Sequence, residues 1–77
     1  MSTFVCQLIG KDVWGTHQII GIIDSMNDAQ KVVEYCEKKY NISFEKEHEI
    51  VGFKSFRCTD YSKDVTICIE RVNSLFD

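Results

Sequence analysis

Apolar and polar residues alternate at the beginning of the chain, where Phe4, Cys6 and Leu8 share one side of the segment 3–9. Alternation with a period of two is typical of a β-strand with one buried face. A second run, 16–23, is rich in isoleucine and follows several turn-forming residues. Together the two segments predict an antiparallel hairpin with a long connecting loop.

The clearest periodicity lies between positions 25 and 41. Apolar residues recur there every three or four positions, on one face of a helix, namely Met26, Ala29, Val32, Val33, Cys36 and Tyr40. Asp24 and Ser25 can accept hydrogen bonds from the first helical turn, so the helix is predicted to begin at Ser25 or Met26. Asn41 tolerates the left-handed conformation that ends many helices.

The second half of the chain predicts two more strands. The segment 43–49 is charged, with Phe44 as its apolar anchor, and is predicted to be a loop. Residues 50–59 are apolar enough to form a strand, and Gly52 within them predicts a β-bulge. After a turn at 60–64, apolar residues alternate again in a final strand, at Val65, Ile67 and Ile69.

These elements predict an α+β fold in a single domain, 1–77, with one four-stranded antiparallel sheet in ββαββ order and one helix packed on one face. Strand 16–23 carries apolar residues on both faces, with Ile20 and Ile22 on one side and Ile19 and Ile23 on the other. One helix cannot cover both faces of such a sheet. The second face is therefore expected to expose an apolar patch, of the kind that marks an interaction surface.

The composition is that of an ordinary folded domain, with 44% hydrophobic and 27% charged residues in 77. The net charge is −3, and no run of basic residues is longer than Lys38-Lys39. Binding of nucleic acid requires a basic surface that neutralises phosphates. Nucleic acid is therefore not expected among the partners.

The sequence predicts a complete, cytoplasmic protein. No window approaches the roughly 18 apolar residues of a membrane span, and the N-terminal residues lack the features of a secretory signal. Cys6, Cys36, Cys58 and Cys68 could form two disulfides in an oxidising compartment, but without an export signal we expect reduced thiols. Their positions among the periodic apolar residues are typical of buried thiols.

No combination of reactive side chains emerges. Zinc sites use closely spaced ligand pairs, but the nearest cysteines, Cys58 and Cys68, fall in different predicted strands. The spacing brings neither His17 nor His48 to a cysteine, as a thiol nucleophile would require. The carboxylates of 45–49 form a charge run typical of a solvated segment. We therefore expect no enzyme, no catalytic residue, no metal site and no cofactor.

The strings VWG (13–15), IIGIIDS (19–25), DA (28–29) and VEYCEK (33–38) describe a strand that leads through a cap into a helix. Over 13–40 this pattern resembles small uncharacterised phage and bacterial accessory proteins. The shared motif is structural and transfers no functional residue. The resemblance implies an accessory protein that binds and blocks a host enzyme or defence factor by occupying its surface.

We predict a non-enzymatic protein-binding module that self-associates as a homo-oligomer, such as a homodimer, or docks on a protein partner through the sheet face opposite the helix. The predicted contact residues are Trp14, His17, Phe53, Tyr61 and Phe76. The alternative is a small-ligand binder, such as a nucleotide-sequestering oligomer. In that case Trp14 would stack on a base while His17, Lys54 or Arg57 binds a phosphate.

Overall fold

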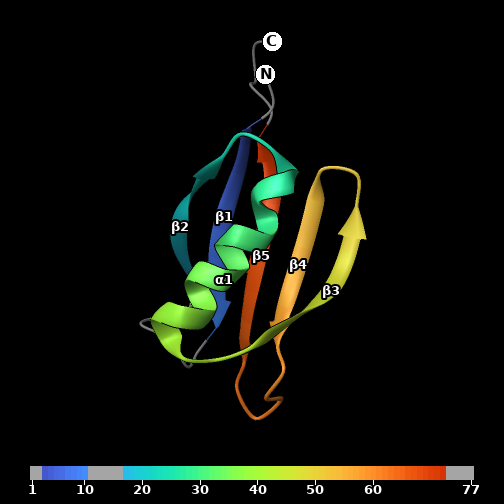
Figure 1. Cartoon of the computed structure of the whole chain (residues 1–77). Helices are drawn as coiled ribbons and strands as arrows, with labels where there is room; N and C mark the ends of the chain where they lie inside the picture. Colours follow the sequence, from blue (N-terminus) through green and yellow to red (C-terminus); the bar gives the residue numbers. More distant parts are fainter. Residues whose placement is uncertain (1–2, 11–16, 73–77) are drawn as a thin grey trace.

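The computed structural model describes residues 3–10 and 17–72, in which one helix lies across one face of an antiparallel sheet (Figure 1). The elements follow in the order β1 (Thr3–Gly10), β2 (His17–Ile23), the 3-10 turn η1 (Met26–Asp28), α1 (Ala29–Tyr40), β3 (Phe44–Ile50), β4 (Phe53–Cys58) and β5 (Val65–Val72). The predicted α+β class is confirmed, because the helix and the sheet form two packed layers.

Within the described residues the sheet has five strands in the order β2-β1-β5-β4-β3, and all neighbouring strands are antiparallel. The hairpin β1–β2 forms one lateral half of the sheet and the hairpin β3–β4 the other. β5 lies between the two hairpins and pairs with β1 and β4. The predicted four-stranded sheet in ββαββ order is therefore wrong, and the order is ββαβββ.

The additional strand is β3, which the charge pattern of 43–49 led us to predict as a loop. It pairs with β4 from Phe44 opposite Cys58 to Ile50 opposite Phe53, although six of its seven residues are exposed. A strand at the edge of a sheet can be held by backbone hydrogen bonds to one neighbour without burying alternate side chains. Charged residues are frequent on such edges, because they discourage pairing with another chain.

Gly52 lies in the two-residue turn between β3 and β4, so the predicted bulge within a strand is wrong at this position. Its φ is +78°, a left-handed conformation that glycine adopts without steric cost. Its carbonyl accepts a hydrogen bond from the backbone N of Arg71 at 2.8 Å, which joins the turn to β5. Bulges occur instead at Ile20 of β2 and Glu47 of β3, the two residues that the pairing register skips.

The helical segment is confirmed at both of its predicted ends. Ser25 Oγ accepts a hydrogen bond from the backbone N of Asn27 at 3.1 Å and caps η1, which continues into α1. Asn41 at the end of α1 has φ 54°, in the left-handed region. Figure 1 shows the chain passing from this end of the helix around to β3 at the edge of the sheet.

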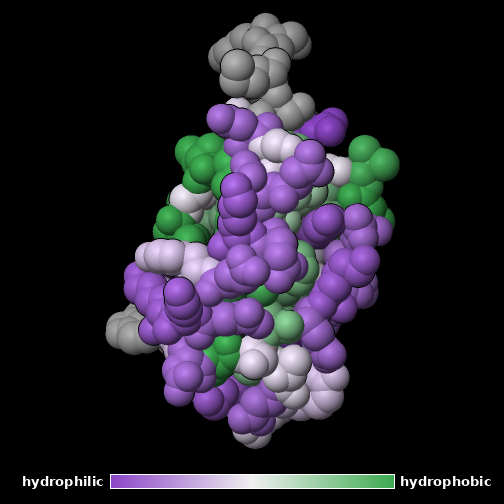
Figure 2. Space-filling view, in the orientation of Figure 1, coloured by the Kyte–Doolittle hydropathy of each residue, from purple (hydrophilic) through white to green (hydrophobic). Residues whose placement is uncertain are grey.

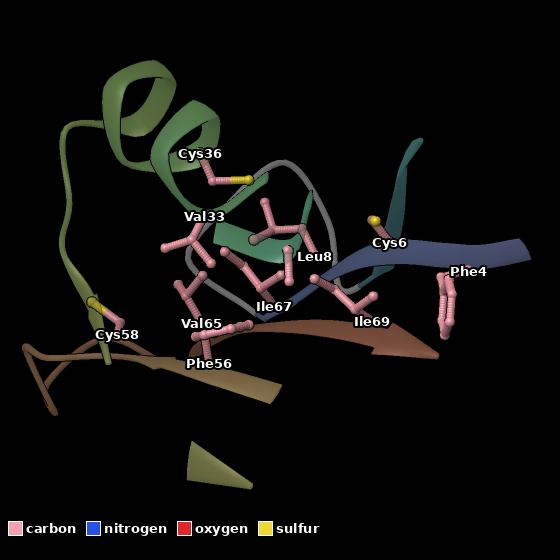
Figure 3. Close-up of a cluster of buried hydrophobic side chains, with 11 residues drawn as sticks. Phe4, Cys6, Leu8, Val33, Cys36, Phe56, Cys58, Val65, Ile67 and Ile69 are labelled. Atoms are coloured by element: carbon pink, nitrogen blue, oxygen red, sulfur yellow. The ribbon is translucent and has the colours of Figure 1, made fainter. Parts of the chain in front are cut away.

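The core lies between α1 and the inner strands (Figure 3). Alternate residues of β1 and β5 point into it, which confirms the predicted inward face of both strands. Among the described residues, the buried hydrophobic ones are Phe4, Cys6, Leu8, Ala29, Val33, Cys36, Phe56, Cys58, Val65, Ile67 and Ile69.

The sheet face opposite α1, called the open face below, is not continuously apolar. The pairing register places one row of residues across all five strands: Ile22, Val5, Glu70, Phe53 and Ile50. The next row is Ile19, Gln7, Cys68, Ser55 and His48. Polar residues interrupt the apolar ones in both rows, so the most exposed isoleucines of this face, Ile19, Ile22 and Ile50, lie on the two outer strands.

Candidate docking edge

The two outer strands of the sheet differ in charge. β3 carries three glutamates and one lysine among its seven residues. β2 contains no Lys, Arg, Asp or Glu between His17 and Ile23. Charged side chains on an edge strand hinder the pairing of a further chain. This protection is present on β3 and absent from β2.

Two isoleucines of β2 project from the open face into solvent, where Ile19 is 68% and Ile22 65% exposed. They share this face because the bulge at Ile20 shifts the alternation by one residue. Ile20 and Ile23 both turn to the helix side and pack against the core. The predicted distribution of these isoleucines between the two faces is therefore wrong, since it assumed an unbroken alternation.

A groove of about 440 Å³ lies between β2 and α1 on the helix side of the sheet, and is called the β2 groove below. Ile20, Ile23, Val32 and Tyr35 are among its lining residues. Gly21 also lines it, and a Cβ built on this glycine would meet no atom within 4 Å. The missing side chain of Gly21 thus leaves part of the groove open.

Four of the most exposed large hydrophobic residues lie at the two margins of the sheet, in β2 and at the β3–β4 turn. Figure 2 shows hydrophobic colour over β2 on one side and at the β3–β4 turn on the other, with a largely hydrophilic helix between them. At the β3–β4 turn, Ile50 is 70% and Val51 91% exposed. Ile50 and Val51 lie beside the charged residues of β3. Ile19 and Ile22, in contrast, lie on a strand without Lys, Arg, Asp or Glu.

A cluster of polar side chains occupies the part of the open face near β3 and β4. Arg57 Nη1 lies 3.8 Å from Glu47 Oε2, and the guanidinium carbon lies 5.5 Å from the centroid of the Tyr61 ring. The Tyr61 hydroxyl donates to Glu45 Oε1 at 2.6 Å, and this hydrogen bond raises the pKa of Tyr61 above its usual value of 10.0. Arg57 is thus paired with Glu47, and the carboxylate of Glu45 is bound by the Tyr61 hydroxyl.

Of the predicted contact residues that the structure describes, His17, Phe53 and Tyr61 all lie toward the open face, but they are spread from β2 to the β4–β5 turn. His17 is exposed at the beginning of β2, whereas half-buried Phe53 begins β4, with β1 and β5 between them. Tyr61, 68% exposed, lies in the turn between β4 and β5. Trp14 and Phe76 lie outside the described residues. Among the predicted contact residues within 3–10 and 17–72, only His17 belongs to the β2 edge.

The phosphate-binding residues of the alternative hypothesis are likewise separated. His17 Nε2 lies 2.5 Å from Oε1 of Gln7, on the open face. Arg57 is on the same face but three strands away, in the polar cluster. Lys54 points to the helix side, where its ammonium lies 3.5 Å from Glu49 Oε2. These three side chains do not converge on one ligand position.

The cysteines are free, with Cys6, Cys36 and Cys58 buried and Cys68 half-buried. Burial raises the pKa of the Cys36 thiol from 9.0 to about 11, and burial also raises that of Cys6. A nucleophilic cysteine needs a lowered pKa, so these two thiols are suited to packing. Within 3–10 and 17–72, no three His, Cys, Asp or Glu side chains are grouped so as to hold a metal ion.

Comparison of the chain with protein-family models, with curated proteins and with solved structures gave no match. In the part of the chain that the structure describes, no helix has the length and apolar character needed to cross a membrane.

Sequence reasoning missed the residues that distinguish the β2 edge, which are Ile19, Gly21 and Ile22. One signal was available, because the absence of charge over 17–23 can be read directly from the sequence. The bulge at Ile20, which brings Ile19 and Ile22 to the same face, had no comparable signal. Its position depends on how β2 pairs with β1.

Proposed function

We propose that this protein is a non-enzymatic protein-binding module that acts in the cytoplasm and binds its partner through the edge of β2. The main support is one observation: an uncharged outer strand bears two exposed isoleucines, Ile19 and Ile22. An outer strand also offers unpaired backbone groups to another chain, and exposed apolar side chains favour burial against a partner. The four free cysteines agree with a reducing compartment.

Binding of this kind places a segment of the partner alongside β2. Backbone hydrogen bonds then contribute affinity, while side-chain contacts determine which segment fits. Ile19 and Ile22 contact the partner on the open face, and the β2 groove receives a side chain on the helix side. A protein that binds in this way can block its target simply by covering it, as the resemblance over residues 13–40 implies for an inhibitor of a host enzyme or defence factor.

Affinity capture from the cells in which the protein naturally occurs tests this function with two matched variants. Ile22→Lys introduces a charge at the proposed contact, and Ile50→Lys introduces the same charge at a similarly exposed residue of β3, 70% against 65%. A stable partner, including a second, differently tagged copy, should be retained by the wild type and by Ile50→Lys and lost by Ile22→Lys. Absence of any partner, or equal retention by all three proteins, would contradict the proposal.

A further inference from the structure

The side chains of β2 are arranged symmetrically about the peptide bond between Ile20 and Gly21. Because of the bulge, these two residues both lie on the helix side of the sheet. Their neighbours, Ile19 and Ile22, both lie on the open face, and the next residue in each direction returns to the helix side. A regular strand has no such symmetry about a peptide bond, since its side chains alternate strictly.

Two copies of β2 placed antiparallel about this point would make matching contacts on both faces. On the open face, Ile19 of each copy would lie opposite Ile22 of the other. On the helix side, Ile20 of each copy would lie opposite Gly21 of the other, where a Cβ has no atom within 4 Å and the β2 groove is open. The large side chain of Ile20 in one copy would thus lie opposite a glycine, which has no side chain, in the other copy.

We propose that the partner at the β2 edge is a second copy of this chain, paired antiparallel about a two-fold axis that passes between Ile20 and Gly21, perpendicular to the sheet. This inference rests on the proposed function and names the partner. The two sheets join into one continuous sheet, with both helices on the same side. A two-fold contact requires a surface that is complementary to itself, and the symmetrical pattern of β2 meets this requirement.

The charges of the two edges favour this pairing and limit it to two copies. Since β2 has no charged residue, antiparallel self-pairing places no like charges opposite each other. The three glutamates of β3 would repel their counterparts in a second β3 edge. The joined sheet therefore ends in a β3 strand on both sides, and association stops at the dimer.

The bulge also favours a copy over a foreign strand. A bulge disturbs the regular spacing of backbone groups along an edge, so an ordinary extended segment forms a poor ladder there. A second copy has the same bulge and brings the matching distribution of side chains. The isoleucine contacts and the β2 groove, more than a continuous ladder, therefore determine which partner binds.

Solution mass, measured by light scattering in reducing buffer over a dilution series, tests the pairing and its register. The wild type is expected at twice the chain mass of 8.9 kDa. The double variant Ile19→Lys/Ile22→Lys places lysine opposite lysine and is expected at the mass of one chain. Ile19→Lys/Ile22→Glu places lysine opposite glutamate at both contacts, and should associate at least about tenfold more tightly than the lysine pair.

Two single variants complete the test, and circular dichroism checks that each variant is folded. Gly21→Val fills the open space in the groove, so a folded monomer is expected. Ile50→Lys changes the other edge and should remain a dimer. The proposal that the partner is a second copy is contradicted if the wild type is monomeric at every concentration. It is also contradicted if the lysine–lysine and lysine–glutamate variants associate equally. A monomer that loses a foreign partner on Ile22→Lys would overturn this inference and leave the proposed function standing.

Discussion

The carboxylate of Glu37 in α1 accepts a hydrogen bond from the backbone N of Phe44, the first residue of β3, at 2.9 Å. This contact attaches the helix to an outer strand in which six of the seven residues are exposed. Glu37→Ala should lower the free energy of unfolding by about 1–2 kcal/mol, because a half-buried amide loses its charged acceptor. Chemical denaturation measures the loss, and faster hydrogen exchange at Phe44 would locate it.

The matched control is Glu34→Ala, which removes an exposed carboxylate from the same helix. Its effect should stay within about 0.5 kcal/mol, as for most surface substitutions. Equal losses in the two variants would show that the bond between Glu37 and Phe44 contributes nothing specific to stability.

Two glycines of the sheet should respond in opposite ways to the same substitution. A Cβ at Gly10 would overlap the backbone carbonyl oxygen of Asp64, whereas a Cβ at Gly21 would meet no atom within 4 Å. Gly10→Ala should therefore destabilise the fold by about 1–3 kcal/mol through overpacking, since relief requires a backbone shift where β1 pairs with β5. Gly21→Ala should be neutral or stabilising by up to about 1 kcal/mol. Urea denaturation at high dilution compares the two, and a Gly10→Ala protein as stable as the wild type would refute this prediction.

Stability should fall at alkaline pH because of Cys36. Burial raises the pKa of its thiol from 9.0 to about 11, so between these values the folded chain retains a proton that the unfolded chain has lost. The corresponding stability is complete below pH 9 and is lost as the pH rises towards 11. The wild type should lose roughly 2 kcal/mol more than Cys36→Ala over this interval. Parallel pH profiles of unfolding free energy for the two proteins would contradict the assignment.

Tyr61 should lose its proton at higher pH than an isolated tyrosine, because its hydroxyl donates to the carboxylate of Glu45. Glu45→Gln removes the negative charge that opposes the phenolate, so the pKa of Tyr61 should fall towards 10. The ultraviolet absorbance of tyrosinate during a pH titration reports the change. In Tyr61→Phe, the same glutamine substitution should leave the titration unmoved, and a shift there would assign the effect to another tyrosine.

The elements predicted from the sequence are those with one face against the core. β1 and β5 alternate because every second side chain is buried, and α1 has a period near 3.6 because one stripe faces the sheet. Ser25 and Asn41 mark the helix ends through backbone chemistry that depends only on nearby residues. Local patterns were sufficient for these elements because each pattern reflects burial directly.

β3 escaped prediction for a physical reason. Its two apolar residues, Phe44 and Ile50, are separated by an even number of positions, yet the bulge at Glu47 places them on opposite faces. No period of two survives such a bulge, and the charged residues between them have low strand propensity. The turn at Val51 and Gly52 was the one local sign that a strand could end at Ile50. Prediction of the β2 edge is limited in the same way. The absence of charged residues in β2 can be seen in the sequence, but the position of its bulge cannot.

β5 follows the other strands in the chain but lies at the centre of the sheet. Its ladder with β1 joins residues as distant in sequence as Thr3 and Val72, so forming it requires the closure of a long loop. The hairpins β1–β2 and β3–β4 can form locally, but neither has a complete core until β5 inserts between them. The speed of folding should thus be set by this insertion, with Val65, Ile67 and Ile69 acting in the slow step.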